Sequence, residues 1–144
     1  MTDVEFHFNA PDKLVYACRL LRKAVRSGSK VVVIAAPEMV RELDAALWTF
    51  DAHSFVPHCV VQTAPASMLG VSPIVLADSA QQVPHTEVLL NLGDSVPAGF
   101  ERFVRLIEVV SLDGEDRVIA RRRWKHYADR GYAIERKDLE VNGS

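Results

Sequence analysis

A basic and aromatic stretch near the C-terminal end carries the side chains best suited to binding chemistry. Residues 117–132, with the sequence RVIARRRWKHYADRGY, contain six arginines and lysines and three aromatic rings in sixteen residues. A guanidinium group can bind a carboxylate through two parallel hydrogen bonds, and an aromatic ring beside it offers apolar contact. This combination favours a surface that receives an extended acidic segment.

The spacing of these side chains predicts an amphipathic helix. At about 100° per residue, one group shares the side that we expect to pack on a sheet: Ile119, Ala120, Arg123 and Tyr127. A second group follows at the edge of that side: Trp124, Arg117, Arg121 and Lys125. A large ring would therefore lie at the border of the core, with three cations beside it.

Two other interpretations of this helix remain open. Its basic face could simply be solvated, as on many amphipathic helices. It could also bind single-stranded nucleic acid directly, because cations and interleaved aromatic rings suit that ligand. The composition of the whole chain argues against direct binding of nucleic acid, since 17 basic and 19 acidic side chains leave a net charge of −2. Dedicated nucleic-acid binders usually carry a wider basic field.

A second group of aromatic residues lies in the segment LDAALWTFDAHSFVPH, residues 43–58. Trp48, Phe50 and Phe55 crowd the end of a predicted helix and the loop that follows it. Some of these rings must belong to the core. Phe55, however, lies two residues before Pro57 and is well placed to present an aromatic anchor at a protein interface. The sequence leaves both roles open.

Motifs of catalysis and metal binding are not found in the sequence. The turn NAPDK after the first predicted strand lacks the glycines that let backbone amides approach a phosphate. The chain has no G-x-S-x-G, H-E-x-x-H or C-x-x-C motif, and its five histidines are scattered, which favours loop or surface positions. Cys18 and Cys59 are expected to be reduced, structural thiols. We therefore expect no catalytic residue, no metal and no cofactor.

Length and composition fit one globular domain. The chain has 144 residues, of which 49% are hydrophobic and 25% charged, enough to bury a core without disulfides or metal. The N-terminal residues lack the pattern of a secretion signal, and the apolar run VVVIAAP is far too short to cross a membrane. We expect a cytoplasmic protein with one domain over residues 1–139 and a flexible tail over residues 140–144.

Strand-like and helix-like segments alternate along the chain. Strands are predicted in VEFHF, KVVVIAAP, HCVVQ, SPIVLA and EVLLNL, and after a short turn in FERFVRLIEVVS. Helices are predicted in APDKLVYACRLLRKAVRSG, PEMVRELDAALWTF and DGEDRVIARRRWKHYADRGY. In the last of these, Asp113 is the expected cap and Gly131 the end. This order predicts an α/β fold with a mainly parallel central sheet flanked by helices.

These residues together resemble a known family. LDAALW followed by SFVPH, and ARRRWKHYADRGY after EVV, look like the chi subunit of bacterial DNA polymerase III, an accessory protein of the clamp loader. The resemblance extends from the first strand to about Tyr132, and its first motif is the more specific one. It implies a fold similar to nucleotide-binding domains but without the phosphate loop, in agreement with the turn that lacks glycine.

The resemblance implies a noncatalytic replisome adaptor. Family members bind the acidic C-terminal tail of single-stranded DNA-binding protein, an aspartate-rich run that ends in Pro-Phe with a free carboxylate. The matching positions in this chain are Arg117, Arg121, Trp124, Lys125, Gly131 and Tyr132. The family commonly has an acidic residue at the position of Arg122 and often a tyrosine at that of Trp124. Neither difference removes the pair of cations that could hold a carboxylate.

The resemblance also implies a partner for the second aromatic group. In the family, positions that match Trp48 and Phe55 contact the psi subunit of the clamp loader, and the same surface can serve a repair helicase. The predicted second site comprises these two residues with Val56 and Pro57. Psi is not present in all bacteria that have chi, so the identity of the second partner stays open. The alternative function is a nucleotide-binding domain or enzyme with an unrecognised site in TAPASMLG or DSAQQVPH.

Overall fold

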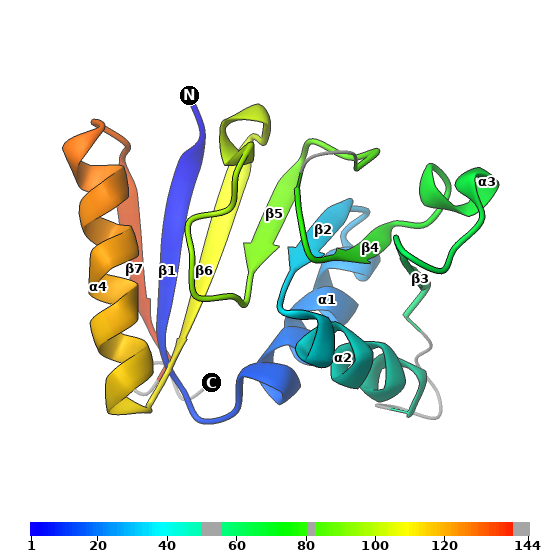
Figure 1. Ribbon diagram of the computed structural model, residues 1–144, viewed down its shortest axis with the longest axis horizontal. Coiled ribbons are helices and arrows are strands. Elements are labelled where there is room, and N and C mark those ends of the chain that lie inside the picture. Colours follow the sequence, from blue (N-terminus) through cyan, green and yellow to red (C-terminus); the bar gives the residue numbers. More distant parts are fainter. Residues whose placement is uncertain (50–55, 81–82, 140–144) are drawn as a thin grey trace.

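An open sheet of seven parallel strands forms the centre of the molecule (Figure 1). The computed structural model describes residues 1–49, 56–80 and 83–139. Its strands are β1 (Asp3–Ala10), β2 (Val31–Ile34), β3 (His58–Val60), β4 (Ile74–Ala77), β5 (Val88–Asn91), β6 (Arg105–Ser111) and β7 (Ile134–Asp138). Its helices are α1 (Lys13–Arg26), α2 (Pro37–Thr49), α3 (Ala66–Leu69) and α4 (Gly114–Asp129), with a 3-10 turn, η1 (Phe100–Arg102). The predicted α/β fold with a mainly parallel sheet is confirmed.

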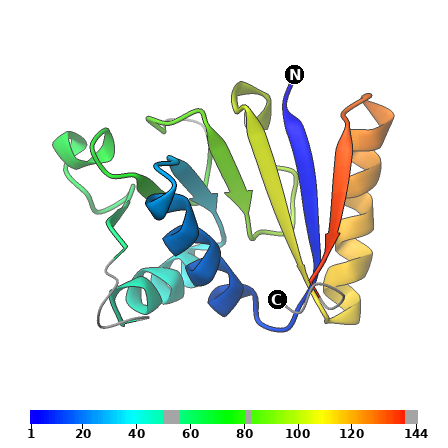
Figure 2. The same cartoon turned by 180° about the vertical axis from the view of Figure 1, so that it is seen from behind.

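The strands follow the order β3-β4-β2-β5-β6-β1-β7 across the sheet. The N-terminal strand β1 therefore lies inside the sheet, where Val4 aligns with Leu106 of β6 on one side and with Ile134 of β7 on the other. Helices α1 and α2 cover one face of the sheet, and α4 covers the other face at the end formed by β6, β1 and β7 (Figures 1 and 2). Side chains of β1 alternate between these two faces.

Two hydrophobic cores result, one on each face. Beneath α1 and α2, residues such as Leu21 and Leu43 are fully buried against the sheet. Between α4 and the sheet, the buried residues include Phe6 and Leu106 of the strands and Tyr127 of the helix. The predicted docking face of α4 is confirmed in three of its four members, since Ala120, Arg123 and Tyr127 are at most 2% exposed while Ile119 is only half-buried.

The ends of the two long helices agree with the sequence signals. Asp12 caps α1 by accepting a hydrogen bond from the backbone N–H of Val15, and Asp113 caps α4 by accepting one from Asp116. Gly131 follows α4 with a φ of +81°, a left-handed conformation that costs glycine little and other residues more. The predicted start and end of α4 are therefore confirmed.

The edge strand β7 was not predicted from the sequence. Its sequence IERKD is mostly charged, and its three central side chains are exposed, so it lacks the apolar alternation of a half-buried strand. It forms because β1 offers a free edge for parallel pairing. The short helix α3 was also missed. The predicted domain boundary at residue 139 coincides with the end of the described residues and stays a prediction.

Three histidines are buried, and two of them overturn the expectation of loop or surface positions, because His7 lies in β1 and His58 in β3 while His85 lies in a loop. His7, His58 and His85 are 3%, 9% and 5% exposed, and each forms a hydrogen bond inside the protein. Burial of a polar ring is stabilised when it finds such a partner. Cys18 and Cys59 are free and buried, as expected for structural thiols. Within the ranges described, no helix is long and apolar enough to cross a membrane, and no group of three or more potential ligands could hold a metal.

Candidate functional site

A pocket of about 280 Å³ lies where α4 meets the β7 edge of the sheet. Six residues line it: Phe8, Arg117, Ala120, Arg121, Trp124 and Arg136. Phe8 comes from β1, Arg136 from β7, and the other four from α4. This set, called the basic pocket below, combines aromatic walls with three guanidinium groups and contains no acidic side chain.

The aromatic wall of the basic pocket is held by the core. The Trp124 ring is half-buried, and its centroid lies 5.0 Å from that of Phe6 and 6.1 Å from that of Phe8. Phe6 and Phe8 are themselves stacked, at 5.7 Å. Because Phe6 is fully buried, the chain of rings connects the pocket wall to the interior. An apolar or aromatic group entering the pocket would therefore meet a preformed surface.

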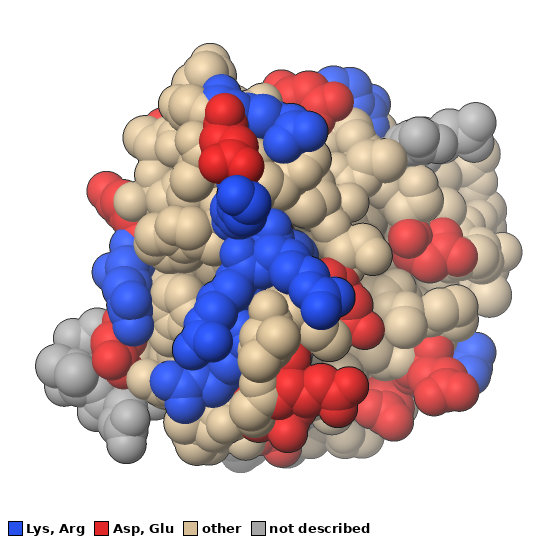
Figure 3. All heavy atoms as spheres, turned by 60° about the vertical axis from the view of Figure 1, so that its left-hand side comes forward, with Lys and Arg blue, Asp and Glu red and all other residues tan. Residues whose placement is uncertain are grey.

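The cations of the pocket are available to a ligand. Arg117 and Arg121 are exposed and one helical turn apart, and neither side chain forms a hydrogen bond or ion pair with any residue that the structure describes. Basic side chains form a continuous area on this side of the molecule (Figure 3). Such a group of guanidiniums is suited to binding carboxylates, which accept bidentate hydrogen bonds.

The structure brings together only part of the predicted first site. Arg117, Arg121 and Trp124 line the basic pocket. Lys125 lies outside the lining, and its ammonium is 3.5 Å from Asp129 in an exposed ion pair. Gly131 ends the helix, and the ring of Tyr132 packs 5.2 Å from that of Phe100. A part for these last three residues in ligand binding stays a prediction.

Two residues of the basic pocket, Phe8 and Arg136, were not among the predicted site residues. Phe8 lies in the predicted strand VEFHF, but its contact with Trp124 of α4 was not predicted, because contacts between distant segments are not visible in local spacing. Arg136 belongs to β7, the strand that was not predicted. Its guanidinium carbon lies 4.6 Å from the centre of the Phe8 ring, in a cation–π contact.

A buried polar cluster fixes α4 on the sheet. Glu108 of β6 accepts hydrogen bonds from Arg123 Nε at 2.9 Å, from the Tyr127 hydroxyl at 2.5 Å and from Asn91 Nδ2 at 3.0 Å. Arg123 also donates to the carbonyl of Asp94 at 3.0 Å. Burial raises the pKa of Glu108, and the charge of Arg123 and the hydrogen bonds from Tyr127, Asn91 and Arg123 oppose that effect. Removal from water likewise raises the pKa of Tyr127.

The predicted second site is only partly described. Trp48, at the end of α2, is 60% exposed, and its ring packs edge-on against His58 at 5.4 Å. Val56 is 1% exposed, so its side chain belongs to the core, and Pro57 is half-buried. Phe55 lies outside the described residues. Trp48 is therefore the exposed aromatic member of this site in the described part of the chain.

Hydrogen bonds hold the residues beneath Trp48. The His58 ring is 2.6 Å from the Val56 carbonyl through Nδ1 and 2.9 Å from the Asp44 carboxylate through Nε2. These contacts connect α2 to β3, the strand at one edge of the sheet. The basic pocket lies at β7, the opposite edge. The two candidate surfaces are thus separated by the width of the sheet (Figure 1).

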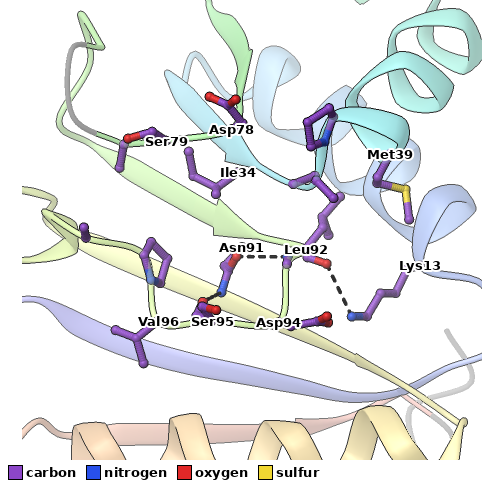
Figure 4. Close-up of a pocket in the computed structure, with 17 residues that line it drawn as sticks. Lys13, Ile34, Met39, Asp78, Ser79, Asn91, Leu92, Asp94, Ser95 and Val96 are labelled. Carbon is purple, nitrogen blue, oxygen red and sulfur yellow. Dashed lines mark hydrogen bonds between the residues drawn. The ribbon is translucent and has the colours of Figure 1, made fainter.

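A larger pocket of about 590 Å³ lies at the carboxyl ends of β2, β4 and β5 (Figure 4). Ligands of open α/β sheets commonly bind at this edge, so it is the natural site for the alternative function. Asp78, Ser79 and Ala80, from one of the two loops considered for that function, line it. Most of the other lining residues are small or apolar.

Two polar side chains of this larger pocket, Lys13 and Asn91, are already engaged with other parts of the protein. The Lys13 ammonium is 3.1 Å from Asp116 and 3.5 Å from the Leu92 carbonyl. Asn91 donates to the Ser95 carbonyl and accepts from the backbone N–H of Gly93 (Figure 4). A catalytic site needs several convergent groups within reach of one substrate, and these side chains are instead engaged with the protein. The geometry therefore favours the basic pocket as the functional site.

The sequence matches a family of known proteins over nearly its whole length. Residues 1–135 match the family model described as DNA polymerase III chi subunit, HolC. A protein of Pseudomonas aeruginosa called DNA polymerase III subunit chi is 31% identical over 140 residues, which cover 94% of this chain and 95% of that protein. Proteins of the same name from Escherichia coli and Haemophilus influenzae are 28% and 27% identical. Those alignments cover 88% and 85% of this chain, and 84% and 85% of the relatives.

Proposed function

Because the chain belongs to the DNA polymerase III chi subunit family, we propose that it couples the replicase to single-stranded DNA-binding protein by holding that protein's acidic C-terminal tail. The family consists of noncatalytic accessory subunits that take part in DNA replication. Beyond family membership, we propose that the ligand is the acidic tail and that its binding site is the basic pocket.

The observation that carries the proposal is the composition of the basic pocket. Arg117 and Arg121 supply two guanidiniums without a described acidic partner, and Trp124 supplies an aromatic wall anchored in the core. A peptide that ends in phenylalanine with a free carboxylate presents the matching groups in one residue. The carboxylate would bind the arginines, and the phenyl ring would pack beside Trp124.

The adaptor role requires a second partner, and the position of Trp48 supports one. An exposed tryptophan is the residue type that most often dominates binding energy at protein interfaces. Its location at the β3 edge leaves the basic pocket at the β7 edge unobstructed. We propose that the Trp48 surface binds the psi subunit or another clamp-loader component, so that both partners are held at once.

The test is a calorimetric titration with an acidic peptide that carries aspartates before a C-terminal Pro-Phe. Arg121→Ala should weaken binding by about 1.5 to 3 kcal/mol, the range for a charge-assisted hydrogen bond at an interface. Arg122→Ala is the matched control, because Arg122 is exposed on the same helix but does not line the pocket. Equal affinity of the parent and Arg121→Ala, with both proteins folded, would refute the assignment.

A further inference from the structure

We propose that Arg136 of β7 is a third carboxylate-binding group of the basic pocket and makes it selective for peptides with an acidic side chain near the terminal carboxylate. The inference rests on the proposed function, since it concerns the same ligand. It adds a specificity-determining residue from a strand outside the motifs that carry the family resemblance.

The sheet register directs Arg136 towards the pocket. Arg136 pairs with Phe6 of β1, and directly paired residues project to the same face of a sheet. Phe6 packs against Trp124 of α4, so this is the α4 face. Lys137, the next residue, projects to the opposite face and lines a different pocket with Glu5 and His7. Because side chains alternate along β7, Arg136 lines the basic pocket and Lys137 lies on the other face of the sheet.

The Phe8 ring holds the Arg136 guanidinium in place. The 4.6 Å cation–π contact positions the group above the ring without using its hydrogen-bond donors. Arg136 is exposed, and its guanidinium forms no hydrogen bond or ion pair with a described residue. Asp138, two residues along the same strand, instead accepts a hydrogen bond from Asn9 at 2.9 Å. The donors of Arg136 therefore remain available to a ligand.

The charge and hydrogen-bond capacity of the basic pocket are sufficient for more than one carboxylate. The pocket gathers three positive charges, from Arg117, Arg121 and Arg136, and no negative charge. A single carboxylate neutralises one of them and has about four acceptor sites, whereas each guanidinium offers five N–H donors. Arg117 and Arg121 lie on the helix, and Arg136 lies on the strand that forms another wall. A peptide whose terminal carboxylate occupies the helix pair can therefore place a preceding carboxylate at Arg136.

The test is a double-mutant cycle between protein and peptide. Two peptides are compared by calorimetry: one with aspartates before its C-terminal Pro-Phe, and one with those aspartates changed to asparagine. Arg136→Ala should weaken the aspartate peptide about tenfold, as expected for one charge-assisted contact, and change the affinity of the asparagine peptide less than about twofold. Arg121→Ala should weaken the binding of both peptides, because the Arg121 side chain binds the terminal carboxylate that both peptides carry. Lys137→Ala, on the other face of β7, is the matched control and should leave both affinities unchanged.

Three outcomes would contradict the inference in different ways. If Arg136→Ala binds the aspartate peptide as well as the parent while Arg121→Ala does not, Arg136 is not a binding residue and the proposed function stands. If Arg136→Ala weakens the binding of both peptides equally, the Arg136 side chain acts by supporting the Phe8 ring and does not bind a second carboxylate. If the parent binds neither peptide, the proposed function fails together with the inference. Unfolding curves of each variant confirm that the folded proteins are compared.

Discussion

The side chains of Arg123 and Glu108 form an ion pair inside the protein, with Arg123 Nε 2.9 Å from Glu108 Oε1. They are 2% and 0% exposed and connect α4 to β6. Because Arg123 must face this partner, the rotation of α4 about its axis is set. That rotation turns Arg117 and Arg121 to the outer edge of the helix, where they line the basic pocket. A buried contact thus positions the candidate binding surface.

Glu108→Gln should destabilise the protein by about 3 to 5 kcal/mol, because it leaves the Arg123 charge buried without its counter-ion. The free energy of unfolding can be measured by urea denaturation. Arg123 is already short of partners, since its Nη2 atom has none among the described residues.

The control for this prediction is a variant that removes both charges. Glu108→Leu combined with Arg123→Met should lose less stability than the sum of the two single changes, because neither charge is left alone in the interior. Additive losses would show that the pair contributes nothing specific to the position of α4.

Peptide binding should depend on the free C-terminal carboxylate and on salt. Amidation of the acidic peptide removes the terminal charge while it keeps the phenyl ring, so affinity should fall by about as much as in Arg121→Ala. Added salt should weaken binding further, since exposed charges are screened over about 8 Å at physiological ionic strength. Titrations of both peptides at several salt concentrations measure these effects. An amidated peptide that binds like the free acid would place the terminal carboxylate away from the arginines.

The isolated protein should bind single-stranded DNA weakly or not at all near physiological salt. Its net charge is −2, and three pocket arginines can replace only a few counterions from the phosphates. Fluorescence anisotropy with a labelled oligonucleotide measures this affinity. Tight binding with a steep salt dependence would favour direct nucleic-acid recognition over the adaptor role.

The central architecture was predictable because its signals are local. Apolar β-branched runs predicted the inner strands, and the spacing of Ala120, Arg123 and Tyr127 predicted the face of α4 that packs on the sheet. Asp113 predicted the first turn of that helix. Such patterns report burial and capping, which depend on neighbours within a few residues.

The remaining features depend on contacts between distant segments. Arg123 was expected to face the sheet, but its partner Glu108 lies in an apolar strand and is identified only by the fold. Arg136 and Phe8 meet because β7 pairs with β1, although they are far apart in sequence. The buried histidines were missed for the same reason, since their hydrogen-bond partners lie on other elements.

Glu5 should make a pH-dependent contribution to stability. The hydrogen bond from His7 and the charge and hydrogen bond of Arg105 lower the pKa of Glu5 from 4.5 to about 2, against the effect of burial. A folded-state pKa below the unfolded value stabilises the protein above about pH 5, and this stabilisation is lost as the pH falls towards 2. After solvent screening of this partly exposed group, about 1 to 2 kcal/mol should remain.

The measurement is the difference in unfolding free energy between the parent and Glu5→Gln at several pH values. The difference should be constant from pH 5 to 7 and shrink as the pH falls below about 4.5. Glu42→Gln is the control, because Glu42 is exposed on α2 and forms no ion pair with a described residue. A difference that does not change with pH would mean that Glu5 contributes by packing and not through its charge.

Trp48→Ala should separate the two partner surfaces. Trp48 is 60% exposed and lies at the β3 edge, while the basic pocket lies at the β7 edge. Loss of an aromatic anchor should weaken clamp-loader binding by about 2 kcal/mol or more, with only a few degrees of change in melting temperature. Acidic-peptide affinity should equal that of the parent, because no residue of the pocket is touched.

The corresponding experiment compares Trp48→Ala with Arg121→Ala in two assays. Clamp-loader subunits retained by the tagged protein are quantified by mass spectrometry, and peptide affinity is measured by calorimetry. Each variant should lose one activity and keep the other, since a bridge must hold both partners on surfaces that do not overlap. If either folded variant loses both activities, the two partners share one site, and the opposite edges of the sheet do not act as separate binding surfaces.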